Sequence, residues 1–153
     1  MFVNERENTE MSLLLEMWSK DQHNVKGIFI KLLEILSKHE NAIFSFKSRP
    51  GVSHSLRAMV KKIDYGDPIL FAIVDIIDDD PENRWLSVCF YNKMITDPEK
   101  AGNLLPKGLL GEDGYCFDLF EFDDAIISYI EQRINESYIK TTASIHAPGK
   151  EPS

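Results

Sequence analysis

The apolar side chains near both ends of the chain recur with the period of an α-helix. In residues 9–19 they are spaced three and four residues apart, which places them on one face of a helix. Residues 21–39 repeat this pattern, and Asp21 is a residue type that caps helix N-termini. The same period predicts a third helix over 123–138, where two aspartates suit the positive end of the helix dipole.

Between these helices the pattern changes to that of β-strands. Apolar and polar side chains alternate over 54–63 and 84–91, as in half-buried strands, whereas 69–78 is apolar on both faces, as in a central strand. Aromatic and β-branched segments at 42–47 and 115–120 add two more strands. We therefore predict an α+β fold, in which an antiparallel sheet of about five strands carries the helices on one face.

The length of 153 residues fits one domain, which we predict over 1–140. The polar tail 141–153 has no periodic pattern and is predicted to be disordered. No apolar run approaches the roughly 20 residues that span a bilayer, so no membrane partner is expected. The polar, acidic start of the chain is unlike a signal peptide, and two cysteines without a CxxC motif fit a reducing cytoplasm.

The registers of two predicted hairpins can be tested, because a one-residue slip would move every side chain to the opposite face. With 64–68 as the first loop, the predicted pairs are Leu56–Ile76, Ala58–Val74, Val60–Ala72, Met59–Ile73 and Arg57–Asp75. With 79–83 as the second loop, they are Ile76–Leu86, Val74–Val88, Ile77–Trp85, Asp75–Ser87, Ile73–Cys89 and Phe71–Tyr91, closed by Asp78–Arg84. Both registers gather apolar side chains on one face, which the helices would cover.

The other face of the sheet, called the second face below, is predicted to be amphiphilic. It is too apolar to be bare and too polar for a plain core. We therefore expect it to be covered by the N-terminal helix, by the long connection 92–114, by a second subunit or by a ligand. The connection is rich in glycine and leucine and is long enough to be typical of a binding loop.

The candidate ligand-binding residues lie on this second face: Arg57, Lys61, Asp75, Trp85, Cys89 and Tyr91. Arg57 either binds an anionic group or forms a cross-strand ion pair with Asp75. Cys89 and Cys116 lie on predicted strands near His54, and buried structural cysteines are commoner than Cys–His nucleophiles. We predict no catalytic residue, no metal ligand and no cofactor.

Charge is unevenly distributed along the chain. The net charge of −8 argues against nucleic-acid binding. The basic segment 47–62 includes "SRPGVSHS", whose hydroxyls and amides could face an anion. Alternatively, this segment is a solvated face, or it pairs with the protein's own acidic segment 64–124, within one chain or across a dimer. The acidic run "DDDPEN" lacks the spacing of a calcium loop, and residues 80–83 suit a type I turn.

The order of the predicted elements resembles that of a known family. A helix, the meander "SLRAMVKK", "LFAIVDII" and "WLSVCFY", the loop "GLLGEDGYCFD" and the helix "AIISYIEQRI" are similar to the small bacterial YdhG-like proteins. The resemblance covers about Asn24 to Tyr138 and implies a frataxin-like α+β fold. It also implies an iron-chaperone role through an exposed acidic surface, which the first helix could supply with Glu5, Glu7, Glu10 and Glu16.

Three hypotheses for the function follow. The first is a small non-catalytic binding or interaction module, acting as a homodimer, that uses the second face and the connection 92–114. The second is an enzyme or sensor that binds an anionic small molecule near Arg57. The third is an iron or metal chaperone that uses an acidic surface.

Overall fold

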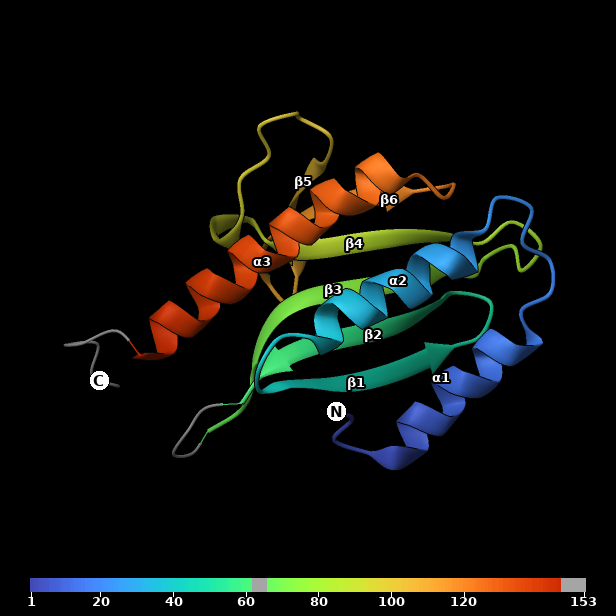
Figure 1. Cartoon of the computed structure of the whole chain (residues 1–153), viewed down its shortest axis with the longest axis horizontal. Helices are drawn as coiled ribbons and strands as arrows, with labels where there is room; N and C mark the ends of the chain where they lie inside the picture. Colours follow the sequence, from blue (N-terminus) through green and yellow to red (C-terminus); the bar gives the residue numbers. More distant parts are fainter. Residues whose placement is uncertain (62–65, 147–153) are drawn as a thin grey trace.

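The computed structural model describes residues 1–61 and 66–146 and confirms the α+β fold (Figure 1). Its elements are α1 (Glu5–Met17), α2 (Val25–Ser37), β1 (Ala42–Arg49), β2 (Ser53–Val60), β3 (Ile69–Ile77), β4 (Trp85–Tyr91), the 3₁₀ helix η1 (Asn92–Met94), β5 (Asn103–Leu109), β6 (Glu112–Leu119) and α3 (Asp124–His146). Within these residues the strands form one antiparallel sheet in the order β1-β2-β3-β4-β6-β5.

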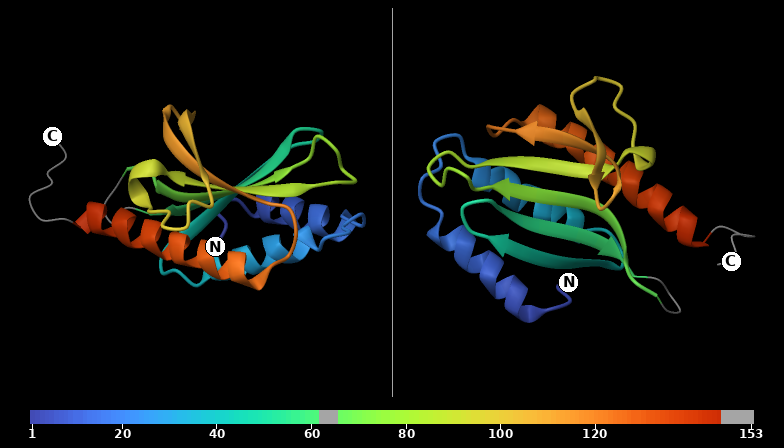
Figure 2. Two further views of the ribbon diagram at one scale, coloured as in Figure 1. Left: turned by 90° about the horizontal axis from the view of Figure 1, so that it is seen from above. Right: turned by 180° about the vertical axis from the view of Figure 1, so that it is seen from behind.

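The helices lie on one side of the sheet, as predicted (Figure 2). α2 buries Ile28, Phe29, Leu32 and Leu36 completely against the sheet. Each such side chain contributes roughly 1.5–3 kcal/mol relative to an exposed one. α1 lies along the β1 edge, where the Glu7 carboxylate accepts the Phe46 amide at 2.7 Å. Phe2 forms a bridge with Phe44 on the same strand, so this edge is covered.

A β-bulge sets the register between β2 and β3. The observed pairs are Ser55–Asp75, Leu56–Val74, Arg57–Ile73, Ala58–Ala72, Met59–Leu70 and Val60–Ile69. Phe71 is therefore an extra residue on β3, opposite the step from Ala58 to Met59. The predicted register is wrong by two residues over Leu56 to Ala58, and by three residues at Met59 and Val60 on the other side of the bulge. An even shift keeps each side chain on its face, so the polarity pattern could not reveal it. The predicted loop 64–68 lies partly outside the described residues.

The bulge also turns Phe71 toward the helices, whereas the prediction placed it on the second face. Its ring lies 5.4 Å from that of Tyr138 and 6.0 Å from that of His39. Its carbonyl oxygen accepts a hydrogen bond of 2.6 Å from the fully buried Ser137 hydroxyl. α3 is thereby held at the bulge.

α3 extends eight residues beyond the predicted end at 138. Thr141 is completely buried and Ile145 packs against the core. These contacts explain why residues 141–146 are helical and not disordered as predicted. The rest of the predicted tail, 147–153, lies outside the described residues.

The second hairpin has the predicted register, with the pairs Ile73–Cys89, Val74–Val88, Asp75–Ser87, Ile76–Leu86 and Ile77–Trp85. Arg84 Nε donates a hydrogen bond of 2.7 Å to Asp78 Oδ1, which confirms the predicted closing pair. The Asn83 amide donates to the Asp80 carbonyl at 2.9 Å, as expected for a β-turn over 80–83.

The strand β5 lies inside the segment 92–114, which the sequence analysis treats as a connection. β5 is exposed along nearly all its length, so it has no alternating apolar face that would predict a strand. It contains Pro106, and its ladder with β6 is irregular between Leu105 and Leu109. Lys107 and Leu110 have positive φ angles. With these features the sequence of β5 resembles that of a loop.

Asp97 fixes the segment that joins η1 to β5. Its carboxylate accepts the amides of Ala101 at 3.0 Å and Gly102 at 2.9 Å, and also the hydroxyls of Tyr115 and Tyr129. Burial would raise the pKa of Asp97, but these four hydrogen bonds lower it to about 2. The hydrogen bond to Asp97 raises the pKa of Tyr115 to about 12. The segment is thus held against β6 and α3.

We expect Asp97→Asn to lower the free energy of unfolding by about 1 kcal/mol at neutral pH, a value reduced for the partial exposure of the group. Because the folded-state pKa of Asp97 is lowered from 3.8 to about 2, its stabilisation is present above pH 4 and lost as the pH falls toward 2. The difference between variant and wild type should therefore shrink over this range in urea unfolding. The exposed Glu121→Gln serves as control. A difference that does not change with pH would contradict the assignment.

Candidate ligand-binding site

The second face of the sheet has no helix over it in the described residues (Figure 2). Alternation and register place these side chains on it: Ser55, Arg57, Met59, Leu70, Ile73, Asp75, Ile77, Trp85, Ser87, Cys89, Tyr91, Cys116 and Asp118. The expectation that the N-terminal helix covers this face is wrong, because α1 packs at the β1 edge.

A small apolar cluster lies at the centre of the second face, separate from the main core. It consists of Leu70, Ile73, Cys89, Leu109 and Cys116, with Met59 and Tyr91 packed against it. Leu109 belongs to β5 and is only 6% exposed. The segment 92–114 therefore covers part of the face through this residue, whereas Leu104, Leu105 and Leu110 remain exposed.

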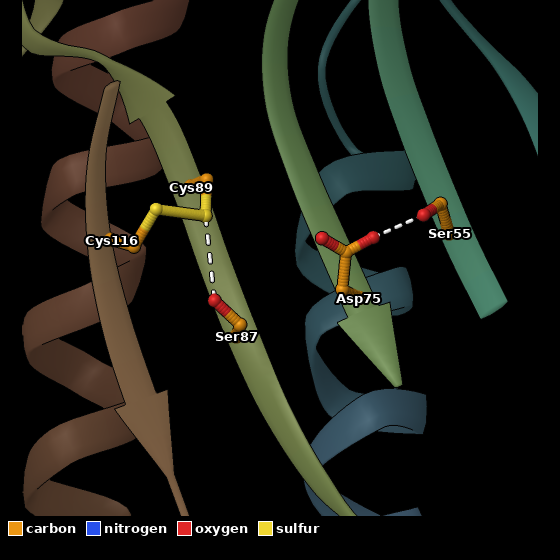
Figure 3. Close-up of a disulfide and its surroundings, with 5 residues drawn as sticks. All are labelled: Ser55, Asp75, Ser87, Cys89 and Cys116. Carbon is orange, nitrogen blue, oxygen red and sulfur yellow. Dashed lines mark hydrogen bonds between the residues drawn. A yellow bond between two sulfur atoms is a disulfide. The ribbon is translucent and has the colours of Figure 1, made fainter. Parts of the chain in front are cut away.

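Cys89 and Cys116 form a disulfide between directly opposed positions of β4 and β6 (Figure 3). The Ser87 hydroxyl lies 3.4 Å from the Cys89 sulfur. Cys89 is thus not a free thiol, and it contributes to the second face as part of an apolar cross-link. Disulfides persist in oxidising surroundings, so the cytoplasmic location inferred from the cysteines stays a prediction.

Asp75 is paired with Ser55 and not with Arg57. The observed register places Ser55 directly opposite Asp75, and the Ser55 hydroxyl donates to the Asp75 carboxylate (Figure 3). Burial raises the pKa of the Asp75 carboxyl above its usual value, while the Ser55 hydrogen bond and the charges of Arg57 and Arg49 partly oppose this shift. The predicted direct Arg57–Asp75 pair is therefore wrong.

Among the residues that the structure describes, Arg57 is left without an ion pair of its own. It faces Ile73 across the strands, and within the described residues its guanidinium forms no salt bridge. Its Nε atom is buried and has no hydrogen-bond partner among those residues. A buried donor without a partner costs roughly 1–3 kcal/mol, so this atom is one that a ligand could satisfy.

Arg57 and Tyr91 line the same hollow, which has a volume of about 460 Å³. Its apolar lining is Met59, Pro68, Ile69, Leu70, Met94 and Leu110. The charged groups around it are Arg57, Asp67, Lys93 and Glu112. Lys93 forms an exposed salt bridge of 3.5 Å with Glu112. Burial, followed by the charge of Glu112, raises the pKa of Tyr91, and the charge of Arg57 partly opposes it.

The remaining candidate residues lie elsewhere. Trp85 is near the opposite end of its strand, where its ring packs 5.1 Å from that of Phe120. Lys61 is exposed and does not line the hollow. The structure thus brings together Arg57 and Tyr91 of the predicted set. Leu110 belongs to the leucine-rich connection 92–114, which was expected to cover the second face. Met94 was not singled out, because it reaches the hollow through η1, whose placement no local pattern indicates.

No family model, curated protein or solved structure matches this chain. The resemblance to the YdhG-like proteins therefore stays a prediction. On α1, Glu7 is bound to Lys47 and to the Phe46 amide. The part of the chain that the structure describes contains no cluster of three or more His, Cys, Asp or Glu arranged to hold a metal. None of its helices is long and apolar enough to cross a membrane.

We expect reduction of the disulfide to lower the free energy of unfolding by about 3 kcal/mol, because it closes a loop of 27 residues in the unfolded chain. Urea unfolding with and without dithiothreitol measures this loss. The double variant Cys89→Ser, Cys116→Ser should unfold at the same urea concentration with and without reductant. A wild type that is equally stable in both conditions would contradict the cross-link.

We expect Asp75→Asn to stabilise the protein at neutral pH, because it removes a buried charge and keeps an acceptor for Ser55. The pKa of Asp75 is raised in the folded state, so its ionisation opposes folding as the pH rises above the ordinary carboxyl range. The gain should therefore disappear in acid. Thermal unfolding across pH 3–7 measures it, with the exposed Asp113→Asn as control. A destabilised variant at neutral pH would show that the carboxylate is needed.

Proposed function

We propose that this protein binds a small, partly apolar anion in the hollow beside Arg57, which acts as a binding site and performs no chemistry on this ligand. The proposal is based on one observation, the unpaired state of the Arg57 guanidinium among the described residues. This guanidinium has a buried, unpartnered Nε and no salt bridge in the described residues, and it lies at the wall of a largely apolar hollow. Such a combination of apolar lining and few polar groups is typical of small-molecule sites.

The charges around the hollow favour a ligand with a single negative charge. Glu112 is paired with Lys93, while Asp67 lines the hollow and Asp75 lies on the neighbouring strand. One guanidinium among these carboxylates can neutralise a monoanion, whereas a phosphate dianion would meet net repulsion. A carboxylate can also accept two parallel hydrogen bonds from a guanidinium. We therefore infer that the ligand is a carboxylate.

The volume and the lining of the hollow indicate the nature of the group that is attached to the carboxylate. About 460 Å³ lies within the range of sites for small organic molecules. Met59, Met94 and Leu110 can pack against an aliphatic or aromatic group, and methionine side chains adapt to irregular shapes. The proposed site thus combines two hypotheses from the sequence, a binding module that uses the second face and an anionic small molecule bound near Arg57. The homodimer, the cytoplasmic location and the metal-chaperone role stay predictions, and the proposal does not depend on them.

We expect octanoate and benzoate to raise the melting temperature of the wild type, and octanamide and benzamide to have a much smaller effect. At a ligand concentration 100 times Kd, binding would add about 2.7 kcal/mol to the stability. Arg57→Ala should lose at least about 1.5 kcal/mol of the binding free energy, that is, roughly tenfold or more in Kd. Thermal shift followed by titration calorimetry measures both effects.

Arg49→Ala is the matched control, because Arg49 is an exposed arginine on β1 that does not line the hollow. It should bind the carboxylates like the wild type. Inorganic phosphate tests the charge argument and should bind more weakly than octanoate. The proposal fails if no carboxylate stabilises the wild type, or if Arg57→Ala and Arg49→Ala respond alike.

A further inference from the structure

A relay of a serine, a histidine and an aspartate lies at the opposite end of the sheet from the hollow. Ser48 of β1 and His54 of β2 are directly opposed in the β1–β2 ladder. The Ser48 hydroxyl is hydrogen-bonded to His54 Nδ1, and His54 Nε2 lies 2.8 Å from Asp78 Oδ2. In the sequence, His54 stood out as a base only beside the cysteines, and no pattern connected its imidazole with Ser48.

The surroundings of the relay keep Asp78 ionised, so its carboxylate accepts hydrogen bonds. Burial would raise the pKa of Asp78, but hydrogen bonds from Arg84, His54 and the Gly51 amide outweigh this effect and lower it. Arg84 Nε binds the other carboxylate oxygen at 2.7 Å, and Gly51 donates at 3.2 Å. The carboxylate of Asp78 is thereby held in one orientation.

This arrangement determines which nitrogen of His54 can act as a base. An ionised carboxylate can only accept hydrogen bonds, so the proton of the neutral imidazole lies on Nε2. The lone pair of Nδ1 then faces the Ser48 hydroxyl. His54 is only 3% exposed and its ring is stacked on that of Phe46, so it cannot easily turn away.

Ser48, in contrast with its two partners, is exposed to solvent. A nucleophile bound to a base that a third group orients is the general pattern of an activated serine. The two nitrogens of the imidazole have exchanged roles compared with the usual triad, in which Nε2 faces the serine. A neutral imidazole accepts a proton at whichever nitrogen carries none, and here that nitrogen is Nδ1, so the chemistry is retained.

We propose that Ser48 is a nucleophile, activated by His54 and Asp78, that reacts with small acyl esters. Ser48 Oγ bonds to the ester carbonyl carbon while its proton passes to His54 Nδ1. The carbon–oxygen bond to the alcohol then breaks, and the alcohol leaves with that proton. Water next attacks the acyl-serine, giving one proton to Nδ1, and the carboxylic acid leaves as Ser48 regains a proton.

The inference does not depend on the hollow beside Arg57, because the relay is built from the opposite strand ends. General-base assistance contributes typically 10²–10⁴-fold. We therefore expect Ser48 to react at least about 100-fold faster than an unassisted serine. Ser55 is the matched comparison, because its hydroxyl is bound to a carboxylate, Asp75, and is hydrogen-bonded to no imidazole of the described residues.

A fluorophosphonate probe tests this directly. The purified wild type should gain one covalent adduct, which peptide mass spectrometry places on Ser48, and p-nitrophenyl acetate should release a burst of one equivalent of p-nitrophenol. Both signals should be absent in Ser48→Ala and unchanged in Ser55→Ala. His54→Gln should slow the labelling at least about 100-fold if circular dichroism shows that it remains folded.

A relay that only ties the two hairpin ends together would give different results. It predicts no adduct on Ser48, or labelling of Ser48 and Ser55 at similar rates, and either result overturns the proposal. This outcome needs the wild type alone, so it stands even if His54→Gln fails to fold. Labelling of folded His54→Gln at the wild-type rate would equally overturn the role of His54.

Discussion

The register between β2 and β3 determines which polar groups meet on the second face. Phe71 is one extra residue on β3, so the pairs on its two sides differ in register by one residue, and the side chains on both sides of the bulge keep their faces. Asp75 meets Ser55, and Arg57 meets the apolar Ile73. A register two residues away would place Arg57 opposite the carboxylate of Asp75. In the observed register the charge of Arg57 stays available at the wall of a hollow, and the extra residue Phe71 anchors α3 through Ser137.

A comparison with Arg84 and Arg133, two other arginines that pack on the protein, shows how unusual the placement of Arg57 is. Arg84 binds Asp78 and lies over the Trp18 ring at 5.2 Å. Arg133 lies 3.3 Å from Glu136 and over the Tyr129 ring at 4.6 Å. Both have a carboxylate and an aromatic ring, the two partners that stabilise a guanidinium best. Arg57 has no carboxylate partner within the described residues, which is why the binding site is assigned to it.

The sequence could predict what depends on alternation and helical period. The three helices, five of the strands and the register of the second hairpin follow from apolar patterns that the core imposes. The register around Arg57 could not follow, because a two-residue shift leaves every side chain on the same face. β5 could not be predicted from the sequence, because an exposed edge strand that contains a proline has no apolar face. The Ser48–His54–Asp78 relay could not be predicted from local patterns, because it joins the ends of two hairpins that are separate in the sequence.

The strand order has a consequence for how the chain assembles. β5 is made before β6 but pairs only with it, because β6 lies between β5 and β4. The two strands can form a local hairpin, which then adds to the meander as one unit. The disulfide joins this unit to β4 at the contact between them. Once the disulfide has formed, the β5–β6 hairpin cannot separate from the meander unless β4 unfolds as well. Separation of this edge of the sheet therefore requires unfolding of the whole sheet and not only of the hairpin.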